Sequence, residues 1–93
     1  MSEDWETGYA TPEEASFGDI PPQFVTVVGT RIDGDHATVW LLTNDTHPFE
    51  DYQVNCVRDK GRWHFESGFP FGAGVPEEVL EQARALGWTG DWV

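Results

Sequence analysis

Residues 52–67 form one predicted β-hairpin, and this segment constrains the fold more than any other. The turn residues Lys60 and Gly61 separate two runs in which apolar and polar side chains alternate. Closing the turn there gathers the apolar set on one face, namely Tyr52, Val54, Cys56, Trp63 and Phe65. It leaves the polar set on the other face, namely Gln53, Asn55, His64 and Glu66. Because a slip of one residue would exchange the two sets, the pattern predicts a single register.

A second hairpin is predicted upstream, with Asp33 and Gly34 at its turn and strands over residues 24–28 and 37–43. Closing this turn pairs even positions of the first strand with odd positions of the second. One face then carries Val28, Ile32, Ala37, Val39 and Leu41. The opposite face carries Val25, Val27, Trp40 and Leu42. Strands that are apolar on both sides are expected to be central or covered on both faces.

Two helices flank the hairpins in the sequence. Thr11 and Glu14 form a capping-box pattern, and Gly18 stops the short helix that they begin. A longer helix is predicted over residues 76–86, with Pro76 at its start and Gly87 as its C-cap. Its apolar stripe can cover one face of the sheet and consists of Val79, Leu80, Ala83 and Leu86.

These elements predict a single α+β domain over residues 1–93. Its core is a four-stranded antiparallel β-meander, with a short N-terminal helix and a C-terminal helix packed on one face. Residues 1–10 and 88–93 are expected to be flexible tails. Six aromatic residues fall in loops or tails, namely Trp5, Tyr9, Phe69, Phe71, Trp88 and Trp92. They either pin these segments onto the sheet or form an exposed apolar patch that binds a partner.

The balance of charge restricts the partners of the chain. Seventeen acidic residues against five basic ones give a net charge of −12. This charge argues against binding of nucleic acid or of anionic membrane surfaces. The longest strongly apolar run, residues 39–42, is too short to span a bilayer. A single cysteine and an acidic N-terminus are typical of a cytoplasmic protein.

No catalytic, cofactor-binding or metal-ligating residue is predicted. Cys56 and His64 are the tempting pair, but the register points them to opposite faces. The histidines, at positions 36, 47 and 64, have no recognised ligand spacing. The glycines of residues 72–74 lack the lysine and hydroxyl of a phosphate-binding loop and are followed by acidic residues.

The turn of the hairpin over residues 52–67 holds three of the five basic residues, namely Arg58, Lys60 and Arg62. We therefore expect a polar partner to touch this turn and the adjoining polar strip, namely Gln53, Asn55, Arg58, Lys60, Arg62, His64 and Glu66. The leading interpretation is a non-enzymatic cytoplasmic protein that acts through contacts with another protein or with itself as a homodimer. One alternative is a small-ligand binder or enzyme, with a shallow pocket under the glycine-rich connection that uses His47, His64 or Glu66. Another is an acidic inhibitor that mimics nucleic acid.

Several motifs carry a resemblance: Thr-Pro-Glu-Glu-Ala at 11–15, Ile-Pro-Pro-Gln-Phe-Val at 20–25, Asp-Gly-Asp-His-Ala at 33–37 and Tyr-Gln-Val-Asn-Cys-Val-Arg-Asp-Lys-Gly-Arg-Trp at 52–63. Over residues 11–68 the chain resembles a group of small actinobacterial proteins, a likeness that implies no activity. The double hairpin also resembles the sheet half of nuclear transport factor-like (cystatin-like) folds. In those folds a longer N-terminal helical part wraps the sheet into a pocket, so this resemblance implies a pocket on one sheet face.

Overall fold

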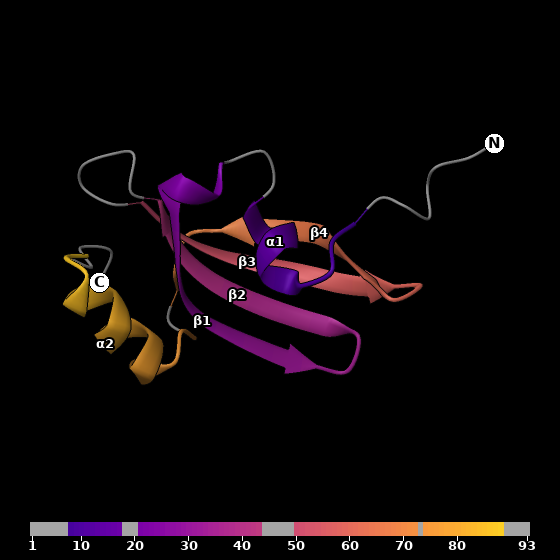
Figure 1. Ribbon diagram of the computed structural model, residues 1–93. Helices are drawn as coiled ribbons and strands as arrows, with labels where there is room; N and C mark the ends of the chain where they lie inside the picture. Colours follow the sequence, from indigo (N-terminus) through magenta and orange to yellow (C-terminus); the bar gives the residue numbers. More distant parts are fainter. Residues whose placement is uncertain (1–7, 18–20, 44–49, 73, 89–93) are drawn as a thin grey trace.

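The computed structural model describes residues 8–17, 21–43, 50–72 and 74–88 (Figure 1). Along the chain these form the helix α1 (Pro12–Phe17), a 3₁₀ turn η2 (Pro22–Phe24), the strands β1 (Val25–Asp33), β2 (His36–Thr43), β3 (Glu50–Asp59) and β4 (Arg62–Phe69), and the helix α2 (Glu77–Ala85). The strands pair antiparallel in the order β1-β2-β3-β4. The predicted α+β meander is confirmed. No helix within the described ranges is long and apolar enough to cross a membrane.

The two helices lie on opposite faces of the sheet (Figure 1). Side chains alternate along β2, so Val39 and Leu41 join the cluster that contains Ala15 of α1, while Trp40 and Leu42 join the cluster that contains Val79 of α2. We call these the α1 face and the α2 face. The strand β2 is therefore apolar on both sides, as predicted. The short N-terminal helix covers part of the face that the C-terminal helix leaves open.

A β-bulge in β1 overturns part of the predicted pattern. Near the turn the register is as expected, with Ile32 opposite Ala37, but Val27 faces Leu41 and Gly29 faces Trp40. Val28 is thus an extra residue and lies in the α2-face cluster, whereas Val25 and Val27 pack against the α1-face cluster. The predicted faces of these three valines were wrong, because one inserted residue inverts the alternation beyond it.

The hairpin of β3 and β4 follows its predicted register from the turn to the pair Cys56 and Phe65. Lys60 and Gly61 have φ values of 57° and 78°, as a two-residue type I′ turn requires. Beyond that pair Asn55 faces Ser67, so Glu66 is the extra residue of a second bulge. Glu66 therefore does not pair with Asn55, as an uninterrupted hairpin would require.

The predicted cap of α1 at Thr11 is confirmed, whereas α2 is one residue shorter at each end than predicted and has Leu86 as its C-cap, followed by Gly87; Gly18 lies outside the described residues. The backbone N–H of Glu14 donates to Thr11 Oγ1 over 3.2 Å, which caps α1. At the end of α2, Gly87 has a φ of 107° and donates to Arg84 O, while Trp88 donates to Ala83 O. This pair of bonds is a Schellman motif.

The inner ends of the two expected tails are packed. Trp88 is 5% exposed and belongs to the α2-face cluster. Tyr9 forms an antiparallel bridge with Trp63 at the outer edge of β4. Tyr9 and Trp88, near the two ends of the described residues, are therefore held against the sheet. The rest of both predicted tails, with Trp5 and Trp92, lies outside the described residues.

Candidate functional site

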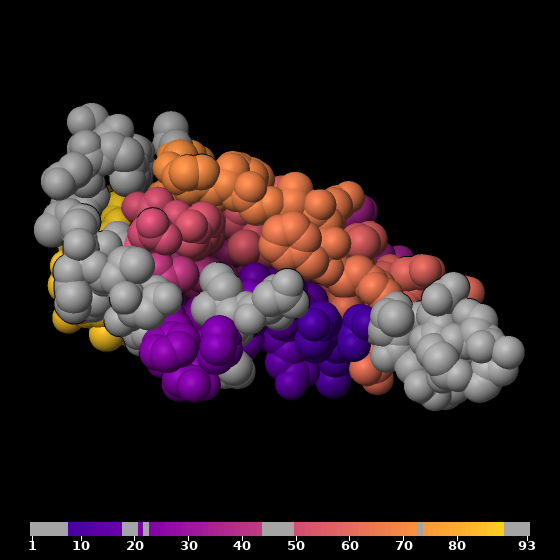
Figure 2. All heavy atoms as spheres, turned by 90° about the horizontal axis from the view of Figure 1, so that it is seen from above, coloured from indigo at the N-terminus to yellow at the C-terminus, as the bar shows by residue number. Residues whose placement is uncertain are grey.

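The α1 face contains an apolar hollow of about 320 Å³ beside the C-terminal end of α1. It exists because α1 has only six residues and cannot cover the whole face. Its floor is formed by the buried side chains of Leu41 and Val54, from the two central strands. Figure 2 looks onto this side, with the indigo atoms of α1 and the orange atoms of β4 on either side of the central strands.

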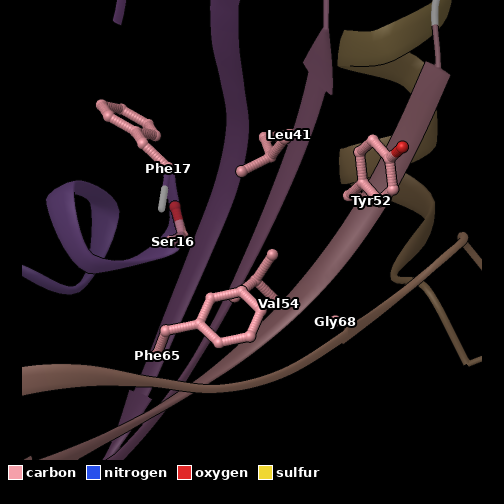
Figure 3. A pocket seen from close by; sticks show the side chains of 7 residues that line it. All are labelled: Ser16, Phe17, Leu41, Tyr52, Val54, Phe65 and Gly68. Atoms are coloured by element: carbon pink, nitrogen blue, oxygen red, sulfur yellow. The ribbon is translucent and has the colours of Figure 1, made fainter. Parts of the chain in front are cut away.

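The walls of the hollow come from three elements (Figure 3). Ser16 and Phe17 of α1 form one side, and Phe65 and Gly68 of β4 form the opposite side. Tyr52 of β3 lies at a third side. Phe65 is 52% exposed, although it belongs to the apolar set of the hairpin. A half-exposed aromatic ring beside an apolar hollow is typical of a contact surface.

The two hydroxyl groups of the hollow already donate hydrogen bonds within the chain. Ser16 Oγ donates to the carbonyl of Glu13 over 2.6 Å, and the Tyr52 hydroxyl donates to Glu50 Oε1 over 3.1 Å. Both protons are therefore occupied. The hollow offers mainly apolar contact, which suits an aliphatic or aromatic group better than a polar substrate.

Cys56 lies in the core of the α1 face, with its Sγ 3.6 Å from the carbonyl of Pro12. Burial, together with smaller effects of the negative charges of Glu13 and Glu66, raises the pKa of its thiol from 9.0 to about 11. The thiol is thus protonated at neutral pH and is a poor nucleophile. His64 pairs with Val57 in the next register position, so the predicted separation of Cys56 and His64 on opposite faces is confirmed.

Two of the three basic side chains in the predicted turn contact other segments of the chain. Arg58 Nε pairs with Asp35 Oδ1 over 3.1 Å, and its guanidinium lies 5.2 Å from the Trp63 ring centroid. Arg62 Nη2 donates to the carbonyl of Gly8 over 2.9 Å. Lys60 is exposed at the tip. Two of the three cations therefore hold neighbouring segments of the chain in place.

Gln53 and Asn55 of the predicted polar strip lie on the α2 face. Gln53 Oε1 accepts a hydrogen bond from Trp40 Nε1 over 3.0 Å. Asn55 accepts from the Thr38 hydroxyl over 3.3 Å and donates to Ser67 Oγ over 3.2 Å. Because Arg58 stacks on Trp63 of the α1 face, the structure does not bring all the predicted surface residues onto one face.

A smaller hollow of about 230 Å³ lies at the glycine-rich connection, where a ligand pocket was expected. It is lined by Glu50, Asp51, Tyr52 and Pro70. The expected residues His64 and Glu66 do not line it, and His47 lies outside the described residues. Over the described ranges, no group of three or more His, Cys, Asp or Glu side chains is placed to hold a metal ion.

Sequence reasoning missed the hollow because its walls join segments that are distant in the chain. Phe65 was placed in the apolar set, but its exposure depends on the length and position of α1. Gly68 lies just beyond the predicted hairpin of residues 52–67, whereas in the structure it belongs to β4 and faces Val54. The glycine in a strand-like run was the one available signal, since glycine in strands often marks a bulge or a close approach.

No protein-family model matches the chain, and no curated protein and no solved structure is significantly similar to it. The resemblance to nuclear transport factor-like folds therefore stays a prediction.

Proposed function

We propose that this chain is a small non-enzymatic cytoplasmic protein that acts through contacts with another protein. The hollow between α1 and β4 receives an apolar side chain of that partner. The observation that carries the proposal is the half-exposed Phe65 ring beside a floor of fully buried aliphatic side chains. Interfaces are commonly anchored by apolar groups that fill such depressions next to exposed aromatic rings.

The chemistry of the hollow supports contact rather than catalysis. Its hydroxyl groups are engaged within the chain, and the Cys56 thiol in the core of the same face is protonated and buried. General acid–base or nucleophilic catalysis needs a titrating or activated group that reaches the substrate. The residues that line this hollow supply none.

The net charge of −12 favours a basic partner. A second copy of the chain brings the same charge and is repelled at low ionic strength. Self-association through this face therefore predicts a dimer that strengthens with added salt. A heterologous basic partner predicts the opposite dependence on salt.

A small apolar ligand is the second candidate. The volume of about 320 Å³ falls at the lower end of the range of roughly 300–1,000 Å³ that is usual for ligand pockets. Such a ligand would fill the same hollow without contacting the rest of the α1 face.

The experiment that tests the proposal places the photo-crosslinking residue p-benzoylphenylalanine at position 65 in the native host. The matched control carries the same residue at position 32, because Ile32 is equally exposed and lies on the α1 face in β1. We expect a protein adduct from position 65 in several-fold excess over position 32. Substitution of Gly68→Leu, which fills the hollow, should abolish it. The mass of the adduct distinguishes a partner protein from a second copy and from a small ligand. Equal yields from the two positions contradict the proposal.

A further inference from the structure

The strand β4 is an outer strand of the sheet, and its second half is open to solvent. Residues 62–64 are buried or half-buried, whereas residues 65–69 are all exposed. The orange atoms of this strand form one border of the molecule in Figure 2. Phe65 and Phe69 expose 52% and 43% of their surface. An outer strand with exposed apolar side chains is a template for pairing with another strand.

The chain already uses this edge once. Tyr9 N donates to Trp63 O and Trp63 N donates to Tyr9 O, each over 2.8 Å. The N-terminal segment then turns into α1 at Pro12. Of the described residues, Tyr9 alone pairs with the outer edge of β4. The edge thus accepts strand pairing at Trp63, and residues 65–69, which include the bulge at Glu66, lie beyond the part that Tyr9 occupies.

The open part of the edge also borders the hollow. Phe65 and Gly68 form the β4 side of the hollow. A strand that pairs with β4 lies about 4.8 Å away and projects alternate side chains to the α1 face. One such side chain would be directed toward Gly68, where it would lie beside the Phe65 ring, whose Cζ is 3.4 Å from the place that a Cβ at position 68 would take. Backbone pairing and filling of the hollow are therefore compatible in one extended segment.

Charge identifies the kind of segment. Glu66 lies within the open part of the edge, and Glu50 accepts the hydrogen bond from Tyr52 at the hollow. The chain has little positive charge to offset these groups, because four of its five basic side chains are engaged elsewhere, namely Arg31 over Trp40, Arg58 with Asp35, Arg62 with Gly8 and Arg84 with Glu77. An incoming segment that supplies Lys or Arg beside its apolar residues complements this surface.

Building on the proposed function, we infer that residues 65–69 of β4 bind an extended basic segment of a partner protein as an added strand, with one apolar side chain of that segment in the hollow between α1 and β4. The backbone pairing supplies part of the affinity, and the hollow selects the apolar residue.

The probe is a capped nonapeptide in which lysine alternates with leucine. It is titrated into the full ¹⁵N-labelled chain while the backbone amide resonances and their hydrogen exchange are followed. Two matched peptides serve as controls: one has N-methyl groups on alternate backbone amides, and the other has glutamate in place of lysine. We expect shifts and slower exchange at residues 65–69. The N-methyl peptide should bind about tenfold more weakly, because backbone hydrogen bonds are lost. The glutamate peptide should bind at least tenfold more weakly.

Two variants of the chain complete the test. Phe65→Ala removes one wall of the hollow and should weaken the lysine peptide about tenfold. Ile32→Ala removes a similarly exposed side chain at the other edge of the α1 face and should leave binding unchanged.

Each remaining outcome is decisive. If the methylated and unmethylated peptides bind equally well, while the Phe65→Ala variant binds the lysine peptide weakly, the inference of an added strand is wrong. The proposed contact at the hollow then still holds. No shift at residues 65–69 with about 1 mM lysine peptide overturns the basic-strand inference, and the crosslink at position 65 then decides the proposed function separately. Shifts at residues 65–69 that depend on protein concentration without peptide identify a second copy as the occupant and also overturn it.

Discussion

The carboxylate of Asp51 accepts a hydrogen bond from the indole of Trp88, with 2.6 Å between Oδ2 and Nε1. Its other oxygen, Oδ1, accepts from the backbone N–H of Phe71 over 3.1 Å. The rings of Phe71 and Trp88 pack against each other with centroids 5.4 Å apart. The Asp51 side chain, at the start of β3, thereby holds both Phe71, in the connection after β4, and Trp88, three residues after the end of α2. This arrangement holds α2 on its face of the sheet.

Removal of this carboxylate should loosen α2. We expect Asp51→Ala to lower the free energy of unfolding by about 2–4 kcal/mol, because two hydrogen bonds to a charged acceptor are lost. Urea denaturation measures the change. The matched control is Glu81→Ala on the exposed side of α2, which should change stability by less than about 0.5 kcal/mol. An effect of Asp51→Ala as small as that of the control would contradict this role.

Gly29 permits the close approach of α2 to β1. A Cβ at this position would lie 2.6 Å from Val79 Cγ2 and 3.3 Å from Trp40 Cε3. We expect Gly29→Ala to destabilise the fold by about 1–3 kcal/mol through overpacking. Combining it with Val79→Ala should recover part of the loss, and a double-mutant cycle by chemical denaturation measures this coupling. Strictly additive effects would show that the two positions do not compete for space. Gly68→Ala is the control, since its Cβ would meet its nearest neighbour at an ordinary 3.4 Å.

The buried thiol of Cys56 should make stability depend on alkaline pH. Burial raises its pKa from 9.0 to about 11, so the folded state keeps the proton over a range where the unfolded state releases it. The contribution is fully present below pH 9 and is lost as the pH rises from 9 to about 11. Its full size is on the order of 2–3 kcal/mol. Urea denaturation across this range should show a steeper fall in stability for the native chain than for Cys56→Ala. Parallel curves for the two proteins would exclude the linkage.

Phe65 should matter for surface binding more than for folding. We expect Phe65→Ala to change the free energy of unfolding by no more than about 1 kcal/mol, since half of the ring is already in water. The same substitution should reduce the fluorescence of an apolar dye such as anilinonaphthalene sulfonate bound to the folded chain. Ile32→Ala should leave most of that fluorescence in place. A large loss of stability in Phe65→Ala would instead assign the ring to the core.

The alternation of apolar and polar side chains predicted most of the fold. Residues 37–42 and 52–56 showed which side chains share a face, and the turns at Gly34 and Gly61 fixed the register next to them. Periodicity could not locate the extra residues Val28 and Glu66, because a bulge leaves the composition of a strand unchanged. It also could not place α1 on the sheet. The hollow and the bridge between Tyr9 and Trp63 both depend on that placement.

Val28, the extra residue in β1, links the length of this strand to the faces on which its side chains lie. Before Val28, the odd-numbered residues of β1 lie on the α1 face, and after it the even-numbered residues do. The alternation in the two halves of the strand is therefore out of phase. Loss of Val28 would bring the halves into phase and leave Val25 and Val27 opposite Thr43 and Leu41, on the α1 face. It would remove one side chain from the α2-face cluster and leave the composition of the α1-face cluster unchanged. The bulge is therefore a position at which β1 can be shortened by one residue without exchanging its two faces.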